Sequence, residues 1–233
     1  VYMQSKTNKK SLRSIEGPEF IEKDDNYDAV QQFYKPVIDR SIKYDRLTGY
    51  FSSMVFALIG DEFYEFFSTG GKMRVVCSPK LSEGDVEALS QGDPAINLEE
   101  NSLKVLLNNK NTRDASYILS FLIHEGLIDV RIADLPSKII LAHEKIGVVT
   151  DSCGNKMSFI GSINETFNGW SERGNIESFD VFRSWEGGET KRIQNHERRF
   201  EKYWSDIVPG VTVKPASSAF FELVEKKSEK GKK

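Results

Sequence analysis

The sequence of this protein contains, at residues 139–164, the run IILAHEKIGVVTDSCGNKMSFIGSIN. It holds two stretches rich in β-branched and other apolar residues, Ile139–Thr150 and Lys156–Ile160, separated by the turn-forming residues 151–155. Two such stretches around a short polar loop are typical of an antiparallel β-hairpin. We therefore predict two paired strands here, with the chain turning off the second strand at Gly161-Ser162.

Working outward from this hairpin, segments with helical period alternate with segments typical of strands. The further strands that we expect are Arg46–Phe51, Met73–Cys77, Ile128–Ala133 and Ser178–Trp185. The helices that we expect are Asp28–Lys43, 52–67, Ser82–Gln91, Leu98–Asn108, Asp114–Glu125 and Glu189–Trp204. Alternating helices and strands with one hairpin predict an α/β fold, a layered α-β-α sandwich with a mixed sheet.

The length of 233 residues suits one large domain or two small ones. We expect one α/β domain over residues 16–210, a flexible tail at 1–15, and a helix or linker with a charged tail at 211–233. The chain starts with Val1 rather than Met, so we expect it to be part of a longer protein. No apolar run approaches the roughly 20 residues of a membrane span, so we expect no membrane association.

Composition limits the kinds of site that the chain can build. The two cysteines exclude a disulfide framework and a four-cysteine zinc site, and their scarcity favours a reducing compartment. We therefore expect a cytoplasmic protein. The formal net charge is −3. Strongly basic chains bind nucleic acids readily, and this chain is slightly acidic. Its total charge therefore gives no support to a nucleic-acid partner.

The hairpin carries a set of residues suited to phosphoryl transfer. Side chains two residues apart on a strand share a face, so we expect His143 and Lys145 to point together. Asn164 follows the neighbouring strand, and the turn at Gly161-Ser162 would offer backbone N–H groups to an anion. An imidazole can attack phosphorus, a lysine and an amide can bind the non-bridging oxygens, and Glu177 can hold the second ring nitrogen.

These residues resemble a known family. The pattern His143-x-Lys145, then Gly161-Ser162-x-Asn164, then Glu177 is similar to the motif of the phospholipase D superfamily. The resemblance implies a phospholipase D-like fold, a nucleophilic or acid–base His143, phosphate-binding Lys145 and Asn164, and a supporting Glu177. It implies no metal and no cofactor. Further candidates for contact with substrate are Ser162, Arg173 and Lys156.

The sequence departs from the family motif at one position. The family's aspartate falls at Thr150, and Asp151 follows one residue later. An offset of one residue on a strand faces the opposite side. Either the turn returns Asp151 to the family's role, or the role is absent from this chain.

Two other segments indicate a particular branch of the family. The stretch Thr48–Ser53 and the stretch Trp170–Glu177 resemble modules that precede helicase domains or occur in restriction systems. This resemblance implies a DNA endonuclease, with a helicase domain as a partner in the same longer chain. Two alternatives stay open: a catalytically silent DNA-docking or dimerisation module of such a protein, and a lipid phosphodiesterase.

The number of motifs predicts the assembly. The family builds its active site from two motifs, and neither His124 nor His196 is followed by a lysine two residues later. The resemblance therefore implies a homodimer with two-fold symmetry, in which one His143 is the nucleophile and its copy the general acid. Paired copies of Lys145, Arg173 and Lys156 would make the local field positive despite the net charge. We expect weak, strongly salt-dependent DNA binding by this domain alone.

Overall fold

A computed structural model of the protein describes residues 10–24, 26–79, 112–135 and 143–216. Eight strands form one sheet, in the order β1-β7-β6-β5-β2-β3-β4-β8. Strands β2, β3 and β4 are parallel, and the other neighbours are antiparallel. The strands are β1 Phe20–Lys23, β2 Lys43–Leu47, β3 Lys72–Cys77, β4 Ile128–Asp134, β5 Ile146–Thr150, β6 Lys156–Gly161, β7 Glu177–Arg183 and β8 Thr212–Pro215.

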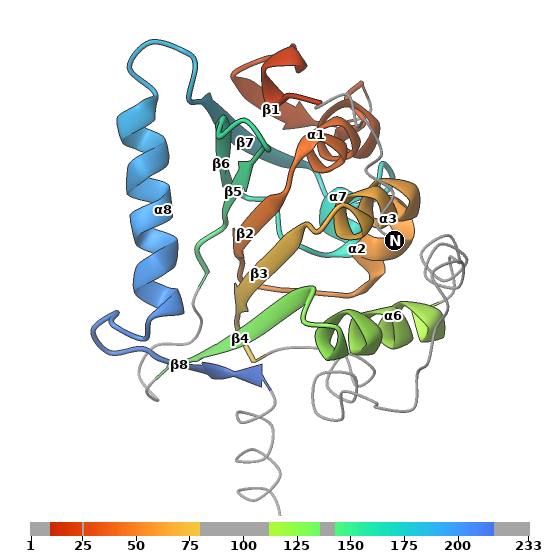
Figure 1. The fold of residues 1–233 in the computed structure, drawn as a ribbon, viewed down its shortest axis with the longest axis vertical. Coiled ribbons are helices and arrows are strands. Elements are labelled where there is room, and N and C mark those ends of the chain that lie inside the picture. The colour runs from red at the N-terminus through yellow and green to blue at the C-terminus, as the bar shows by residue number, and fades with distance from the viewer. Residues whose placement is uncertain (1–9, 25, 80–111, 136–142, 217–233) are drawn as a thin grey trace, which may run out of the picture.

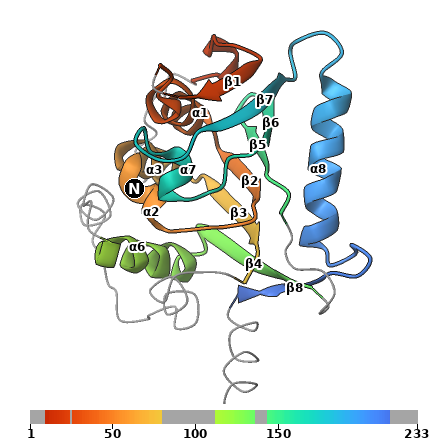
Figure 2. The same ribbon diagram turned by 180° about the vertical axis from the view of Figure 1, so that it is seen from behind.

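Helices cover both faces of this sheet, as Figures 1 and 2 show. On one face, α8 (Thr190–Trp204) is the only helix of the described residues, and it lies over β5, β6 and β7. The opposite face carries α1 Lys35–Arg40, α2 Met54–Leu58, α3 Gly60–Ser68, α6 Thr112–His124 and α7 Phe167–Trp170. The predicted α/β sandwich with a mixed sheet is therefore confirmed.

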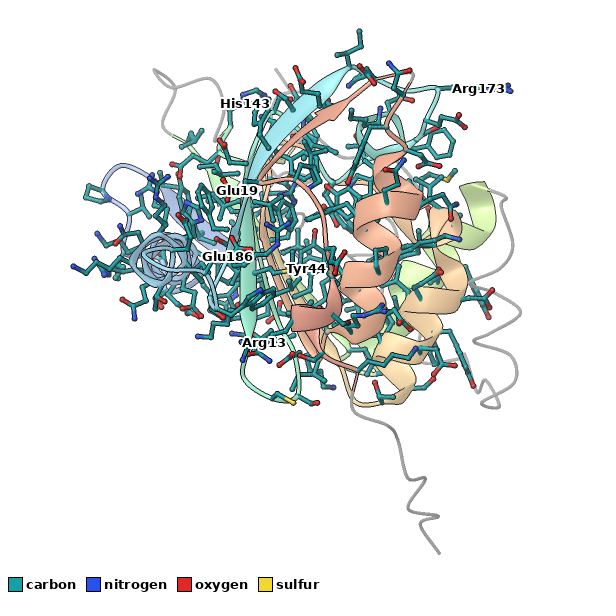
Figure 3. The ribbon with its side chains drawn as sticks, turned by 90° about the horizontal axis from the view of Figure 1, so that it is seen from above. Arg13, Glu19, Tyr44, His143, Arg173 and Glu186 are labelled. Atoms are coloured by element: carbon teal, nitrogen blue, oxygen red, sulfur yellow. The ribbon has the colours of Figure 1, made fainter. Side chains whose placement is uncertain are left out.

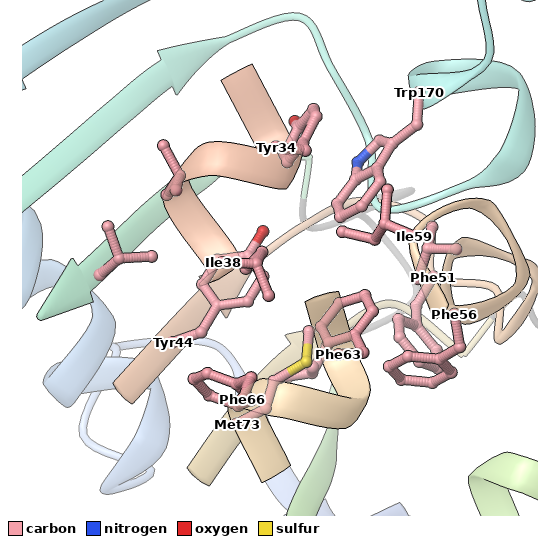
Figure 4. Packing of buried hydrophobic residues seen from close by; sticks show 14 of the residues in the cluster. Tyr34, Ile38, Tyr44, Phe51, Phe56, Ile59, Phe63, Phe66, Met73 and Trp170 are labelled. Carbon is pink, nitrogen blue, oxygen red and sulfur yellow. The ribbon is translucent and has the colours of Figure 1, made fainter. Parts of the chain in front are cut away.

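The larger of two hydrophobic clusters fills the space between the sheet and the helices of the second face. Many of its side chains are aromatic, and Figure 4 shows several of these rings packed between β2, α3 and α7. The rings of Tyr34 and Trp170 are stacked with centroids 3.7 Å apart. A smaller cluster, which includes Leu47 and Phe200, packs under α8. No helix among the described residues is long and apolar enough to span a membrane.

The helices differ from the predicted ones where proline and glycine interrupt them. The predicted helix 28–43 is a π-helical segment, Val30–Tyr34, that continues into α1, and Pro36 has no N–H to donate into that turn. The predicted helix 52–67 is split into α2 and α3 at Ile59, whose backbone leaves helical geometry just before Gly60. Gly70 and Gly126 follow the C-terminal ends of α3 and α6 and adopt positive φ, as glycines that end helices commonly do.

The strands follow the prediction with shifted ends. Strand β5 begins only at Ile146, and β2 covers Lys43–Leu47 rather than Arg46–Phe51. Strands β1 and β8 were not predicted, and β8 extends the sheet beyond β4. Leu12, in the segment that we expected to be a flexible tail, is fully buried. The predicted helices Ser82–Gln91 and Leu98–Asn108, and residues 139–142 of the first hairpin strand, lie outside the described residues.

Candidate functional site

One end of the sheet gathers the residues that the motif singled out. The C-terminal ends of β1, β2 and β6 meet there with the N-terminal ends of β5 and β7. The pairing of the strands shows this arrangement, because Lys23 lies opposite Glu177, and Ile146 lies between Leu47 and Ile160. His143 and Lys145 therefore lie at this end just before β5, Asn164 follows β6, and Glu177 begins β7.

His143 and Lys145 precede β5 and differ in exposure. The imidazole of His143 is exposed, and its ring meets the Tyr50 ring edge to face with centroids 6.1 Å apart. Lys145 is only 6% exposed, and its Nζ donates to the His143 carbonyl at 2.9 Å. The expectation that both residues lie on the strand is wrong, because β5 starts only at Ile146. The site therefore has an accessible imidazole at His143 and a buried ammonium-bearing side chain at Lys145.

The loop after β2 orients Asn164. The Tyr50 backbone N–H donates to Asn164 Oδ1 at 3.1 Å, and the Thr48 hydroxyl lies 3.3 Å from the same oxygen. The amide oxygen is therefore held by this loop, which directs Nδ2 away from it. Because the ring of Tyr50 also contacts His143, the segment Thr48–Ser53 connects the two motif residues. This gives a physical role to a segment that the sequence marked only by resemblance.

Glu177 is fixed by its neighbours rather than by the histidine. Its carboxylate accepts hydrogen bonds from Ser162 Oγ and, at 3.1 Å, from Asn175 Nδ2. The predicted bond from Glu177 to the ring of His143 is thus replaced by contacts with Ser162 and Asn175. Ser162 belongs to the site through this bond, as a residue that orients Glu177.

The backbone after β6 does not form the anion site that we expected. The Gly161 N–H donates to the Lys145 carbonyl at 3.4 Å, and the Ser162 N–H donates to the Ser178 carbonyl at 2.9 Å. Both donors are used in sheet pairing. The chain also does not enter a helix at this turn, because α7 begins only at Phe167.

Buried charge at this end of the sheet is unbalanced. Lys23, Arg46 and Lys145 carry three positive charges, and Glu165 and Glu177 carry two negative ones, so the five buried side chains sum to +1. Burial lowers the pKa of Lys145, the nearby Arg46 lowers it further, and Glu177 opposes the shift. Burial likewise lowers the pKa of Lys23, against the charges of Glu177 and Asp28. A buried surplus of positive charge next to an exposed imidazole favours an anionic ligand.

Lys23 and Arg46 are site residues that the sequence analysis missed. Lys23 is 2% exposed, and its Nζ donates to the carbonyl of Asn175, two residues before Glu177. Arg46 is fully buried, with its Nε 2.9 Å from Glu165. Arg46 shares the inward face of β2 with Tyr44, and Lys23 shares the inward face of β1 with Ile21, although β1 itself gives little signal in the sequence. A charge at an inward position indicates a buried partner.

Asp151 and Lys156 lie at the other end of the hairpin. Asp151 accepts hydrogen bonds from the backbone of Leu12, Cys153 and Asn155 and from the side chains of Ser11 and Asn155. Lys156 pairs with Glu197 of α8 at 2.6 Å. Figure 3 shows His143 far from Arg13, which neighbours the Leu12 contact with Asp151. The structure therefore does not bring these two residues to His143, and the turn does not return Asp151 to it.

Arg173 is exposed in the loop between α7 and β7, and Figure 3 shows its side chain extending away from the molecule. The structure does not place it against the motif residues. Among the described residues, no group of three or more His, Cys, Asp and Glu side chains could hold a metal ion.

Comparisons with known proteins give remote structural likeness only. No protein-family model matches the sequence, and no curated protein matches it. NucT from Helicobacter pylori aligns with a TM-score of 0.44 and 12% identity, over 83% of this chain and 96% of that chain. Phosphatidylserine synthase of Haemophilus influenzae Rd KW20 aligns with a TM-score of 0.41 and 13% identity, over 86% of this chain and 42% of that chain.

Proposed function

We propose that this chain is a phosphodiesterase of the phospholipase D type that cleaves nucleic acid, DNA in particular, with His143 as the nucleophile. One observation carries the proposal: at this end of the sheet an exposed imidazole stands beside three buried cationic side chains, Lys23, Arg46 and Lys145, and only two buried carboxylates, Glu165 and Glu177. Such an arrangement suits a phosphodiester, whose single negative charge meets the surplus. The motif resemblance supports the same chemistry.

The reaction proceeds through two displacements at phosphorus. A ring nitrogen of His143 attacks phosphorus, the P–O bond to the leaving oxygen breaks, and that oxygen takes a proton from a second imidazole. A water molecule then gives a proton to the second imidazole and attacks phosphorus, and the P–N bond breaks to free His143. No metal is required, because Lys145 and Asn164 Nδ2 stabilise the non-bridging oxygens. Among the described residues, the ammonium group of Lys145 donates to one partner, the His143 carbonyl, which leaves two donors for the substrate.

The second imidazole comes from another copy of the chain. His196 lies on α8 and is held by Ser158 of β6 at 2.9 Å, and His124 ends α6, so neither stands at the site. A two-fold homodimer would bring two copies of His143 to one phosphodiester. We include this homodimer in the proposal.

A silent DNA-docking module of a larger helicase or restriction protein is the second candidate. The observation that favours it is the position of Asp151, which leaves the site without the carboxylate of the family motif.

The test compares substrates and histidines in one preparation. Labelled single- and double-stranded oligonucleotides and phospholipid vesicles are incubated with the wild-type chain, with His143→Ala and with the control His124→Ala. We expect oligonucleotide cleavage that falls by at least about 1,000-fold in His143→Ala and is unchanged in His124→Ala. Tight oligonucleotide binding without cleavage would establish the silent module, and cleavage of vesicles alone would establish the lipid enzyme.

A further inference from the structure

The stretch 163–165 is clamped to the stretch 44–52 by buried polar contacts. Glu165 and Arg46 are both fully buried and form an ion pair at 2.9 Å. The hydroxyl of Tyr44 donates to the Glu165 carboxylate at 3.0 Å, and Arg46 Nη2 donates to the carbonyl of Ile163. We refer to Tyr44, Arg46 and Glu165 as the clamp.

The backbone around the clamp extends the same connection. The Glu165 N–H donates to Thr48 Oγ1 at 3.1 Å, and the Glu165 carbonyl accepts from the Ser52 N–H at 2.8 Å. Phe51 and Glu165 also form an isolated parallel β-bridge. Asn164 therefore stands between two residues whose positions the clamp fixes, and its own Oδ1 is held by the same stretch.

Burying two full charges costs free energy that an apolar pair would not cost, so such a pair is weak grounds for a stabilising role. The contacts of the clamp instead converge on residues 163–165, which include Asn164. We propose that the clamp is a positioning device, which holds the Asn164 amide in its phosphate-binding orientation before substrate arrives. This inference rests on the proposed function.

Arg46 also connects the clamp to the second phosphate-binding residue. Its charge is one of the causes that lower the pKa of Lys145, after burial itself. Neutralising Arg46 therefore relieves the positive field at Lys145. Tyr44 carries no charge, so Tyr44→Phe disturbs the geometry without changing that field.

A double-mutant cycle between Glu165 and Asn164 tests the proposal. We expect Asn164→Ala to lower kcat by about 100-fold and Glu165→Gln to lower it by about 10-fold, both with little change in KM. If Glu165 acts through Asn164, Glu165→Gln changes kcat by less than about 2-fold in the Asn164→Ala background. Equal factors in both backgrounds overturn the proposal.

Two variants separate positioning from loss of fold. Tyr44→Phe removes one hydrogen bond and leaves the ion pair, and we expect a smaller fall in kcat with the same coupling to Asn164. The control Asp45→Asn removes the partner of Arg74 on the opposite face of β2, where Nε and Oδ1 are 2.7 Å apart. It should lower the thermal midpoint without coupling to Asn164. Coupling of Asp45→Asn as strong as that of Glu165→Gln contradicts the positioning role.

Binding of inorganic phosphate, measured by titration calorimetry on the same variants, keeps the two proposals apart. Phosphate binding with the predicted coupling but no hydrolysis overturns the proposed function and supports the clamp. Hydrolysis without coupling overturns the clamp alone. A wild-type protein that neither binds phosphate nor hydrolyses a phosphodiester overturns both.

Discussion

At the scale of single residues, Glu177 depends on Lys23 for its setting. Lys23 donates to the Asn175 carbonyl, and Asn175 in turn donates to Glu177. We expect Lys23→Met to lower kcat by about 3- to 10-fold without lowering the thermal midpoint, because a methionine fills the buried site and removes the donor. Lys72→Met is the matched control, since Lys72 also donates to a backbone carbonyl, that of Gly126, in an exposed setting. Wild-type activity in Lys23→Met would exclude Lys23 from the site.

Asp151 has a structural role, because its hydrogen bonds lie within the hairpin turn and with residues 11–12 rather than at His143. Its carboxylate connects the hairpin turn to the buried segment at Ser11-Leu12, and these hydrogen bonds lower its pKa although burial opposes the shift. We expect Asp151→Asn to lower the free energy of unfolding by about 1–3 kcal/mol. The kcat of the folded protein should not change, as urea unfolding and kinetics on one sample will show. A large fall in kcat at full folding would return Asp151 to the catalytic group.

At the scale of elements, α8 contacts the segment His143–Lys145 through the ion pair between Arg199 and Glu144. Arg199 donates to both oxygens of Glu144, between His143 and Lys145, and Tyr203 donates to Glu144 at 3.1 Å. The bond from Arg199 is the main cause that lowers the pKa of Glu144 below its ordinary 4.5. A carboxylate whose pKa is lower in the folded than in the unfolded state stabilises the fold at pH values above its unfolded pKa. This stabilisation is lost as the pH falls below that unfolded pKa and through the folded one.

The corresponding variant is Glu144→Gln. Both partners are more than one-third exposed, so we expect a loss of less than about 1 kcal/mol at pH 7. The difference from wild type should shrink as pH falls below 4.5, the ordinary pKa of this group. Urea unfolding across this pH range measures it, with the exposed Glu172→Gln as control. A difference that grows toward acid pH would have the wrong sign for this ion pair.

The elements that could be predicted were those whose pattern is local. The hairpin followed from two apolar stretches around Asp151–Asn155, and α6 followed from its period and Gly126. The break at Ile59 was missed because the apolar face continues through it. Strand β1 was missed because four residues with alternating burial give little signal.

At the scale of the whole molecule, the site could be predicted only in part. His143, Lys145, Asn164 and Glu177 come from one continuous region, and the motif located them. Lys23 and Arg46 reach the same end of the sheet only through the strand order, with β1 beside β7 and β2 beside β5. The local sequence pattern does not determine which strands are neighbours in the sheet, so it could not predict these contacts.

The homodimer that we propose would cover the end of the sheet that carries His143. Ile176, directly before Glu177, is 86% exposed at that end, which is unusual for a large apolar side chain. We expect Ile176→Asp to weaken the homodimer by at least about 10-fold and to make the specific activity fall on dilution. Sedimentation velocity measures the association, with Ile207→Asp, 63% exposed after α8, as control. Dissociation caused by Ile207→Asp and not by Ile176→Asp would place the interface on the α8 side.

In the proposed mechanism, His143 cleaves a phosphodiester with no metal ion. The most direct test is the rate of oligonucleotide cleavage in excess EDTA, for the wild-type chain and for His143→Ala. We expect the same wild-type rate with EDTA as with added magnesium, and a rate lower by at least about 1,000-fold for His143→Ala in both. A wild-type rate that disappears in EDTA and returns with magnesium would contradict it.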